Sequence, residues 1–205
     1  MTSPGSQPLA PQLLEEAADM IGRIANRQRA AVALVGGFAL QHFGSSRLTG
    51  DIDVISSAPL HELEPAKPLS FGGQRAAVLV PGNASIGTHV LVPVDVIVRT
   101  DDFAELYADA LDHAFVAGLH EPLGRPAAPD KRAPLPIVEP EYLAAMKMAA
   151  GRRKDQDDLA FLITAAAIDL PKAERIIRKH LGAYAIKEFR TFVAETAWLA
   201  SRSDE

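Results

Sequence analysis

Hydrophobic residues recur along the first third of this chain with two different periods. From Leu13 to Ala25 they return every three or four positions, which predicts an amphipathic helix of about 16 residues. The apolar run 31–35 stops at Gly36-Gly37, as expected of a buried strand that turns sharply into a helical stretch over 38–43. After a loop, an alternating pattern predicts a second strand from Asp51 to Ser56.

Strand-like patterns continue to residue 98, and helical patterns dominate after residue 140. Two strands, over 76–80 and 86–98, are separated by the turn tripeptide Pro81-Gly82-Asn83 and are therefore predicted to pair antiparallel. We then expect a helix over 101–111, a strand over 113–117, and helices over 141–151, 155–167, 172–181 and 184–200.

Six prolines between residues 121 and 140 separate these two halves and exclude regular structure there. The sequence thus predicts an α+β fold, in which a mixed β-sheet flanked by helices is followed by a C-terminal helical bundle. The predicted domains are a core with an N-terminal helix over 1–120, a Pro-rich connection over 121–140, and a helical domain over 141–205.

Two carboxylates stand one residue apart at the start of the second predicted strand. Residues i and i+2 of a strand point to the same face, so Asp51 and Asp53 are expected side by side while Ile52 and Val54 enter the core. Like charges at that spacing are unfavourable unless a positive group lies between them. Oxygen-only ligands favour a hard divalent cation, so the pattern indicates Mg²⁺ or Mn²⁺.

A third acid, Asp95, lies within the apolar run 91–98 of the longest predicted strand. Its environment predicts burial, and a buried carboxylate must be compensated either by a cation or by a hydrogen-bond network that includes an arginine or backbone amides. Gly36 and Gly37 follow a strand and precede a helix, which would let the backbone approach a triphosphate at the helix N-terminus. Acids and glycines in this order suit two-metal phosphoryl transfer.

The composition narrows the function classes. The chain has 205 residues and no cysteine, which excludes disulfides, thiolate zinc sites and cysteine nucleophiles, and which suits a cytoplasmic protein. A net charge of −5 argues against a domain whose main role is to grip nucleic acid by its phosphates. The N-terminus lacks the features of a signal peptide, and we expect no membrane span.

The chain contains four motifs that occur together: Gly36-Gly37-Phe38-Ala39-Leu40, Arg47-x-Thr49-x-Asp51-Ile52-Asp53, Val94-Asp95-Val96-Ile97 and the stretch from Tyr142 to Leu159. The first three resemble the core of the nucleotidyltransferase superfamily related to DNA polymerase beta. The stretch from Tyr142 to Leu159 is similar to the helical motif of the branch that contains AbiEii-type toxins.

This resemblance implies a role for each matching residue. Asp51, Asp53 and Asp95 would be catalytic metal ligands for Mg²⁺ or Mn²⁺, and Asp95 would also help to activate the acceptor hydroxyl. The first motif departs from the common Gly-Ser by having glycine at position 37, so a serine contact to phosphate is missing. The residues expected to bind the nucleotide are Gly36, Gly37, Arg47, Thr49, Lys147, Arg152, Lys154, Asp155 and Asp158.

The segment 147–158 also has an interpretation of its own. Gly151 is predicted to break the helix, after which Asp155 would act as the N-cap of the next one. An alternative is an exposed charged linker between two helices.

Two functions are expected from these patterns. The first is a metal-dependent nucleotidyltransferase that moves a nucleoside monophosphate from an NTP to a hydroxyl on RNA, protein or a small molecule, in the manner of a type IV toxin with an antitoxin partner. The second is a non-catalytic nucleotide-binding protein or toxin–antitoxin partner that keeps the same fold.

Overall fold

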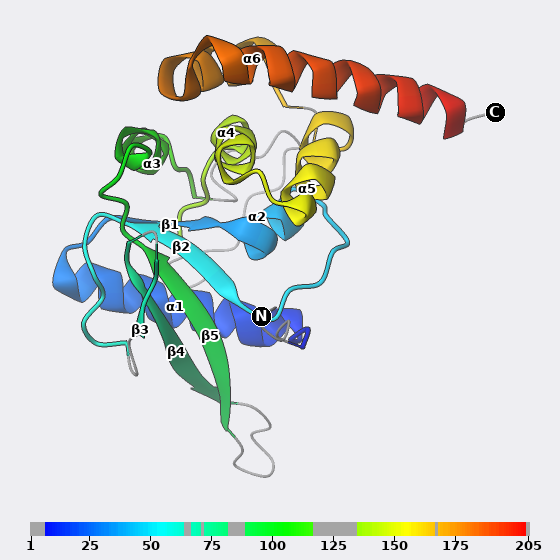
Figure 1. Cartoon of the computed structure of the whole chain (residues 1–205). Coiled ribbons are helices and arrows are strands. Elements are labelled where there is room, and N and C mark those ends of the chain that lie inside the picture. The colour runs from blue at the N-terminus through cyan, green and yellow to red at the C-terminus, as the bar shows by residue number, and fades with distance from the viewer. Residues whose placement is uncertain are drawn as a thin grey trace. The chain divides into compact units, whose positions relative to one another are not determined.

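The computed structural model describes residues 7–63, 67–70, 72–81, 89–116, 135–166 and 168–203 (Figure 1). Its helices are α1 (Pro11–Gln28), α2 (Gly36–His42), α3 (Ala104–Asp112), α4 (Pro140–Ala150), α5 (Arg153–Thr164) and α6 (Leu170–Ser203). Its strands are β1 (Val32–Val35), β2 (Ile52–Ser56), β3 (Lys67–Pro68), β4 (Gln74–Pro81) and β5 (His89–Ile97). No helix among these residues is both long and apolar enough to cross a membrane.

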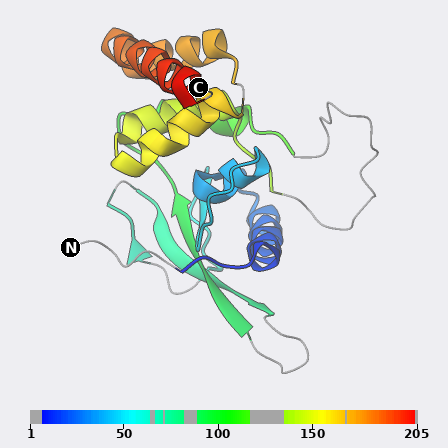
Figure 2. The same cartoon turned by 90° about the vertical axis from the view of Figure 1, so that its right-hand side faces the viewer.

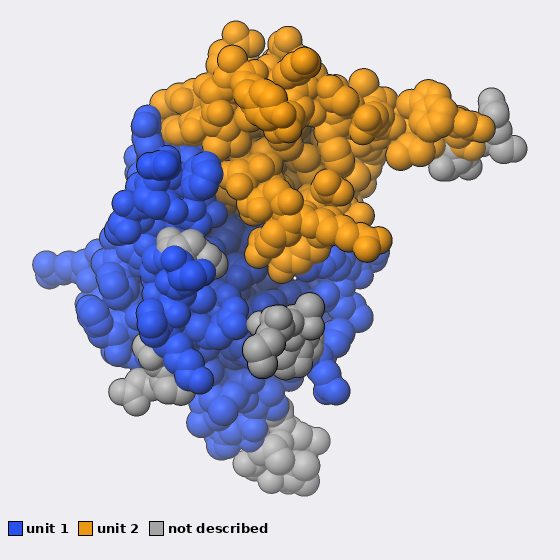
Figure 3. All heavy atoms as spheres, in the orientation of Figure 1, with its two compact units in different colours: residues 1–42, 46–138 blue, residues 43–45, 139–205 orange. Residues whose placement is uncertain are grey.

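The chain forms two compact units, which are coloured separately in Figure 3. Unit 1 comprises residues 1–42 and 46–138, and unit 2 comprises residues 43–45 and 139–205. Most of the predicted Pro-rich connection lies outside the described residues, so the three-part domain division stays a prediction.

Unit 1 is built on a five-stranded mixed sheet in the order β1-β2-β5-β4-β3. β2 and β5 run parallel, whereas the other neighbouring strands are antiparallel. β5 therefore lies in the middle of the sheet, between β2 and β4 (Figure 1). This arrangement confirms the predicted α+β class and the antiparallel pairing of the two strands around the turn at Pro81.

The helix α1 packs along one face of the sheet, against β4 and β5 (Figure 2). Its apolar stripe is buried, as the helical period of the sequence requires, and includes Leu14, Ala17 and Ile21. β4 alternates buried and exposed positions, and its buried residues, such as Val78, pair with buried residues of β5, such as Val92. The face of the sheet that α1 covers is thus apolar core, whereas the opposite face carries both buried apolar residues, such as Ile55 and Ile97, and the charged side chains of Asp53 and Asp95.

Unit 2 contains the three C-terminal helices, which contact one another. α4 begins at Pro140, a favoured first helical residue, and ends at Ala150, where it is capped by Gly151 with a left-handed φ of 60°. The two predicted helices over 172–181 and 184–200 form α6, and Gly182 interrupts them with a φ of 85° and a ψ of −177°. Glycine tolerates this conformation better than any other residue, so the predicted break at Gly182 is confirmed.

Two local predictions need correction or restriction, and one short strand was not predicted. The strand predicted over 113–117 is reduced to a bridge between Phe115 and Ile137, and residue 117 lies outside the described part of the chain. The two-residue strand β3 was not predicted, because two residues carry no detectable period. Gly82 and Asn83 of the predicted turn also lie outside the described residues.

Candidate functional site

A row of charged residues crosses the sheet of unit 1 at one level. Asp53 of β2 is the register partner of Asp95 of β5, and Asp95 is the partner of Arg75 of β4. Lys67 of β3 is the partner of Arg75 and completes the row. Register partners on adjacent strands project from the same face, so two acids and two bases lie side by side. We call these four residues the charged row.

The register that forms the charged row is set by the apolar face behind it. Val54 and Val96 are partners one position farther along, and both are fully buried. A slip of one residue in either strand would bring an acid into the core and a valine to the polar face. Ile52 and Val54 enter the core as the sequence predicted.

Asp95 is held by Arg75 in a bidentate ion pair. The Arg75 Nε donates to Asp95 Oδ1 at 2.7 Å, and Nη2 donates to Oδ2 at 2.6 Å. The side chain of Asp95 is 12% exposed and that of Arg75 is 52% exposed. Of the two alternatives that the sequence left open for this acid, the structure shows the hydrogen-bonded arginine.

Asp51 and Thr49 form a short local contact just before β2. The Thr49 hydroxyl donates to Asp51 Oδ1 at 2.7 Å, and the threonine itself is buried. Its backbone carbonyl accepts a hydrogen bond from the Leu9 amide at 3.0 Å. The Asp51 carboxylate is therefore oriented by Thr49, whose backbone is in turn held by the Leu9 amide.

Close approach requires the first glycine of the motif and leaves little room around the second. Gly36 has a φ of 67°, and a Cβ there would lie 2.0 Å from Asp53 Oδ2. The Asp53 carboxylate thus rests directly against the backbone of Gly36. A Cβ on Gly37 would lie 3.1 Å from Thr49 Oγ1, a distance that leaves little space for any side chain.

Thr49 is the nearest neighbour of Gly37, so a side chain at position 37 would require Thr49 to shift by a few tenths of an ångström. Arg47 is close as well, since its Nη2 lies 3.7 Å from the ideal Cβ position of Gly37. The carbonyl of Arg47 accepts a hydrogen bond from Gln41 Nε2 at 2.8 Å, which ties this loop to α2.

All three acids act electrostatically on Arg75. Its hydrogen bonds and charge interaction with Asp95 raise the pKa of the guanidinium, and the nearby charges of Asp51 and Asp53 raise it further. Opposite charges stabilise the protonated form of a base in this way. The three carboxylates therefore belong to one electrostatic cluster with Arg75 as its cation.

The donor chemistry of this cluster fits a hard divalent cation in part. Asp51 and Asp53 offer carboxylate oxygens, the ligands that Mg²⁺ and Mn²⁺ prefer. Asp95 does not fit in this arrangement, because Arg75 engages both of its oxygens. Among the described residues, no group of three acidic, histidine or cysteine side chains is arranged to hold a metal ion.

Unit 2 contains a second charged cluster, which is buried. Lys147 Nζ lies 3.1 Å from Asp155 Oδ1 and 2.5 Å from Asp158 Oδ2. The exposed side chain of Arg152 reaches the same Asp155, with Nε 2.6 Å from Oδ2. The three inner side chains are at most 9% exposed. We call these four residues the Lys147 cluster.

The Lys147 cluster corrects two local predictions. An exposed charged linker is wrong, because both acids and the lysine are buried in mutual ion pairs. Asp155 is not the N-cap of α5; Arg152 is, and Asp155 lies three residues later, where its carboxylate accepts a hydrogen bond from the Arg152 amide at 3.3 Å. The predicted helix break at Gly151 is confirmed.

Burial disfavours the charged form of Asp155, but the hydrogen bond from Arg152 and the charge of Lys147 outweigh that effect and lower the pKa of the carboxyl group. Lys154 is exposed, and the structure does not bring it into the cluster.

Arg75 is the residue of this site that the sequence analysis missed. It is a lone charged residue in the alternating strand Gln74–Pro81, on the exposed alternation. That pattern is typical of an ordinary solvent-facing residue, and its partner lies 20 positions away in the sequence. The pair becomes visible only from the register between β4 and β5, which cannot be read from the sequence.

Comparisons with known proteins show the fold. No protein family model matches the sequence, and no curated protein does. A nucleotidyltransferase-like antigenic protein from Paracoccidioides brasiliensis is similar in structure, with a TM-score of 0.51 and 16% identity over 88% of this chain and 95% of that one. At this identity the likeness shows a shared nucleotidyltransferase-like fold.

Two further solved structures are more distant. JHP933 from Helicobacter pylori gives a TM-score of 0.41 with 12% identity, over 95% of this chain and 94% of that one. The antibiotic-resistance factor ANT(2'')-Ia gives a TM-score of 0.33 with 15% identity, over 94% of this chain and 97% of that one.

Proposed function

We propose that this chain is a metal-dependent nucleotidyltransferase that moves a nucleoside monophosphate from an NTP to a hydroxyl acceptor. The observation that carries this proposal is the register of the charged row, which sets Asp53 beside Asp95 on adjacent parallel strands. Support comes from the nucleotidyltransferase-like fold and from the Asp51 carboxylate two residues before Asp53.

Asp51 and Asp53 would hold Mg²⁺ or Mn²⁺ through their carboxylate oxygens. Such an ion supplies charge stabilisation for the phosphates when it is bound. Thr49 orients Asp51, and the missing side chain of Gly36 leaves room for the Asp53 carboxylate. Arg47, close to Gly37, would supply positive charge toward the nucleotide.

In the proposed transfer, the acceptor oxygen forms a bond to the α-phosphorus, the bond from that phosphorus to the bridging oxygen breaks, and pyrophosphate leaves. The hydroxyl proton passes to a carboxylate oxygen of Asp95. In the structure Arg75 donates hydrogen bonds to both oxygens of Asp95. Arg75 must therefore withdraw for this step, and its half-exposed side chain has solvent to move into.

The Lys147 cluster is expected to contribute to nucleotide binding, as the family resemblance implies. In this structure Arg152 and Lys154 have exposed side chains that a phosphate can reach. Lys147 is enclosed by Asp155 and Asp158, so its direct effect, together with Arg152, is to balance the charge of those two acids. The same proposal includes an acceptor hydroxyl on RNA, protein or a small molecule. It also includes a role as a toxin with an antitoxin partner, in the manner of AbiEii-type proteins.

A non-catalytic nucleotide-binding protein is the second candidate, and one observation favours it. Arg75 already neutralises Asp95, the residue that a transfer reaction would use as its base. The absence of a serine at position 37 points the same way.

Transfer of label from each of the four α-³²P-labelled NTPs to an acceptor in a cell extract, with Mg²⁺ present, tests the first candidate. We expect a labelled acceptor with the wild type and none with Asp53→Asn, while the exposed Asp102→Asn serves as the matched control that retains activity. Equal labelling by Asp53→Asn would refute the proposal. Calorimetric binding of an NTP with Mg²⁺ but no transfer with any extract would support the second candidate.

A further inference from the structure

The C-terminal half of α6, after the break at Gly182, has one buried and one exposed face. Ile186 and Phe189 point inward and are 5% and 0% exposed. Tyr184 and Trp198, by contrast, are large side chains that are 73% and 55% exposed. Aromatic residues at such exposure are typical of interaction surfaces.

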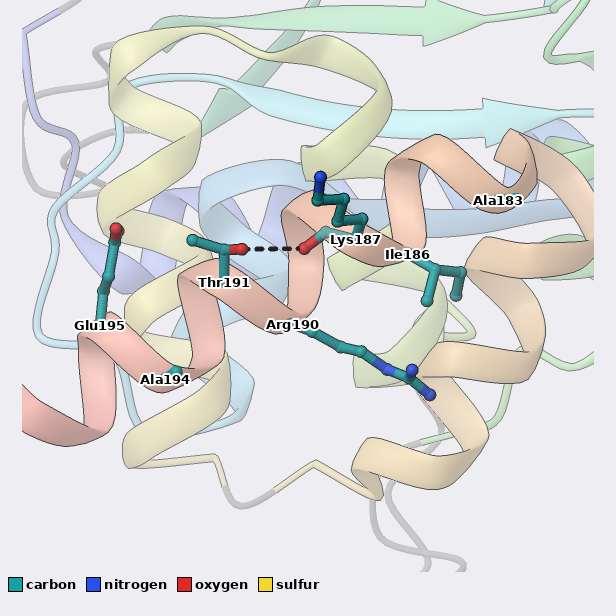
Figure 4. A pocket seen from close by; sticks show the side chains of 7 residues that line it. All are labelled: Ala183, Ile186, Lys187, Arg190, Thr191, Ala194 and Glu195. Atoms are coloured by element: carbon teal, nitrogen blue, oxygen red, sulfur yellow. Dashed lines mark hydrogen bonds between the residues drawn. The ribbon is translucent and has the colours of Figure 1, made fainter.

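A shallow groove lies on this part of α6, as Figure 4 shows, with an open volume of about 540 Å³. Its wall is formed by residues of α6 between Ala183 and Glu195. Two of the lining residues, Ala183 and Ala194, are small and exposed and allow another helix to approach closely. Arg190 at its edge is occupied, because its guanidinium pairs with Glu174 at 2.5 Å.

The side chains along this exposed face are arranged symmetrically about Thr191. Lys187 stands four residues before it and Glu195 four residues after it, which places each about 6 Å away along the helix axis. Tyr184 and Trp198 stand seven residues before and after it, about 10 Å away. Seven residues are close to two helical turns, so these side chains share one face with Thr191.

The charges at the symmetric positions are opposite. Lys187 and Glu195 each form no ion pair with another of the residues that the structure describes. They are also two turns apart on their own helix, which is too far for them to pair with each other. An identical helix placed antiparallel, with its Thr191 opposite Thr191, would bring lysine against glutamate twice and tyrosine against tryptophan twice.

We propose that this face of α6 binds a second copy of the chain in an antiparallel, two-fold symmetric pair centred on Thr191. Such an isologous interface uses the same patch on both chains, and the face has that self-complementarity in charge and in aromatic residues. Arg202 lies over the Trp198 ring at 4.8 Å and keeps this aromatic side chain in a defined place at the edge of the patch. The inference is independent of the proposed nucleotidyl transfer.

Charge reversal tests the pairing in the full-length chain. Sedimentation velocity over a range of concentrations should show the wild type as a dimer, and Lys187→Glu or Glu195→Lys alone should weaken association by at least tenfold. The double variant Lys187→Glu with Glu195→Lys should restore association, because the two charges exchange places across the axis. Arg175→Glu, an equal charge change on the exposed surface of the first half of α6, should leave association unchanged.

A residue on a two-fold axis meets its own copy, which gives a second test. The chain has no cysteine, so Thr191→Cys introduces a single thiol whose oxidation should give a covalent dimer, whereas Arg175→Cys should not. A wild type that stays monomeric at every accessible concentration would overturn the proposal. A double variant that associates no better than the single ones, with Thr191→Cys unlinked, would overturn it as well.

Discussion

Replacing Arg75 by glutamine should make the protein less stable without Mg²⁺ and more responsive to Mg²⁺. The substitution removes both hydrogen bonds to Asp95 and leaves a carboxylate whose side chain is 12% exposed without its cation. Breaking a buried ion pair costs about 3–5 kcal/mol, whereas an exposed pair is worth about 0–1 kcal/mol. Because Arg75 is 52% exposed, we expect a loss of about 1–2 kcal/mol.

The free energy of the ion pair between Arg75 and Asp95 also determines how strongly Arg75 competes with a metal ion for the Asp95 carboxylate. In the wild type a cation at Asp51 and Asp53 gains nothing from Asp95 until Arg75 is displaced. If that displacement costs about 1.4 kcal/mol, its removal in Arg75→Gln tightens Mg²⁺ binding about tenfold. At saturating Mg²⁺ the variant should then recover about 1.4 kcal/mol more stability than the wild type does.

Urea unfolding followed by circular dichroism at pH 7, with and without Mg²⁺ at constant ionic strength, measures both quantities. The matched control is Arg23→Gln, which removes an exposed pair with Asp19 at 2.6 Å on α1 and should change neither stability nor the Mg²⁺ response by more than about 0.5 kcal/mol. If Mg²⁺ stabilises Arg75→Gln no more than it stabilises the wild type, Arg75 does not compete with Mg²⁺ for Asp95 and has a structural role alone.

Three further outcomes are expected. Gly36→Ala should cost at least about 1–2 kcal/mol of stability from its φ of 67° alone, and it should abolish Mg²⁺ binding by displacing the Asp53 carboxylate. Gly151→Ala, at a φ of 60° in open space, should show the backbone cost without the loss of binding. Urea unfolding measures the stability cost, and calorimetry measures Mg²⁺ binding. Lys147→Met should lower the free energy of unfolding by about 3–5 kcal/mol, because it leaves two buried carboxylates without their shared cation, and a loss below about 1 kcal/mol would contradict the ion pairs described. The pKa of Asp155 is lowered in the folded state, so the stabilisation by its carboxylate is complete above its unfolded pKa of about 3.9 and is lost as the pH falls through the folded pKa. The difference in unfolding free energy between the wild type and Asp155→Asn should therefore be full at pH 7 and narrow below about pH 4. A difference independent of pH would refute this.

The helices and strands with several turns or alternations were predictable because each buries one apolar face. α1, β2 and the antiparallel pair β4–β5 all follow from their periods. The glycine breaks at residues 151 and 182 were predictable for a different reason, namely that both adopt positive φ values that other residues avoid.

The partners of the charged residues were not predictable, because they depend on register and packing between distant segments. The sequence placed Asp95 in a buried strand but left its compensation open between a cation and an arginine. Only the pairing of β4 with β5 selects Arg75. Likewise, the sequence left an exposed charged linker open as one alternative for residues 147–158, and only the packing of α4 against α5, which buries Lys147 between two acids, excludes it.

The central position of β5 also has a consequence for how the protein folds. Asp53 and Asp95 are distant in sequence, and their strands are parallel, so no hairpin can bring them together early. The chain must close a long loop before the pair forms, and such non-local contacts form slowly. Since β5 has a neighbour on each side, hydrogen exchange at its amides should require opening of the whole sheet. The pairing of Asp53 with Asp95 therefore depends on a long-range contact between parallel strands and not on a local turn.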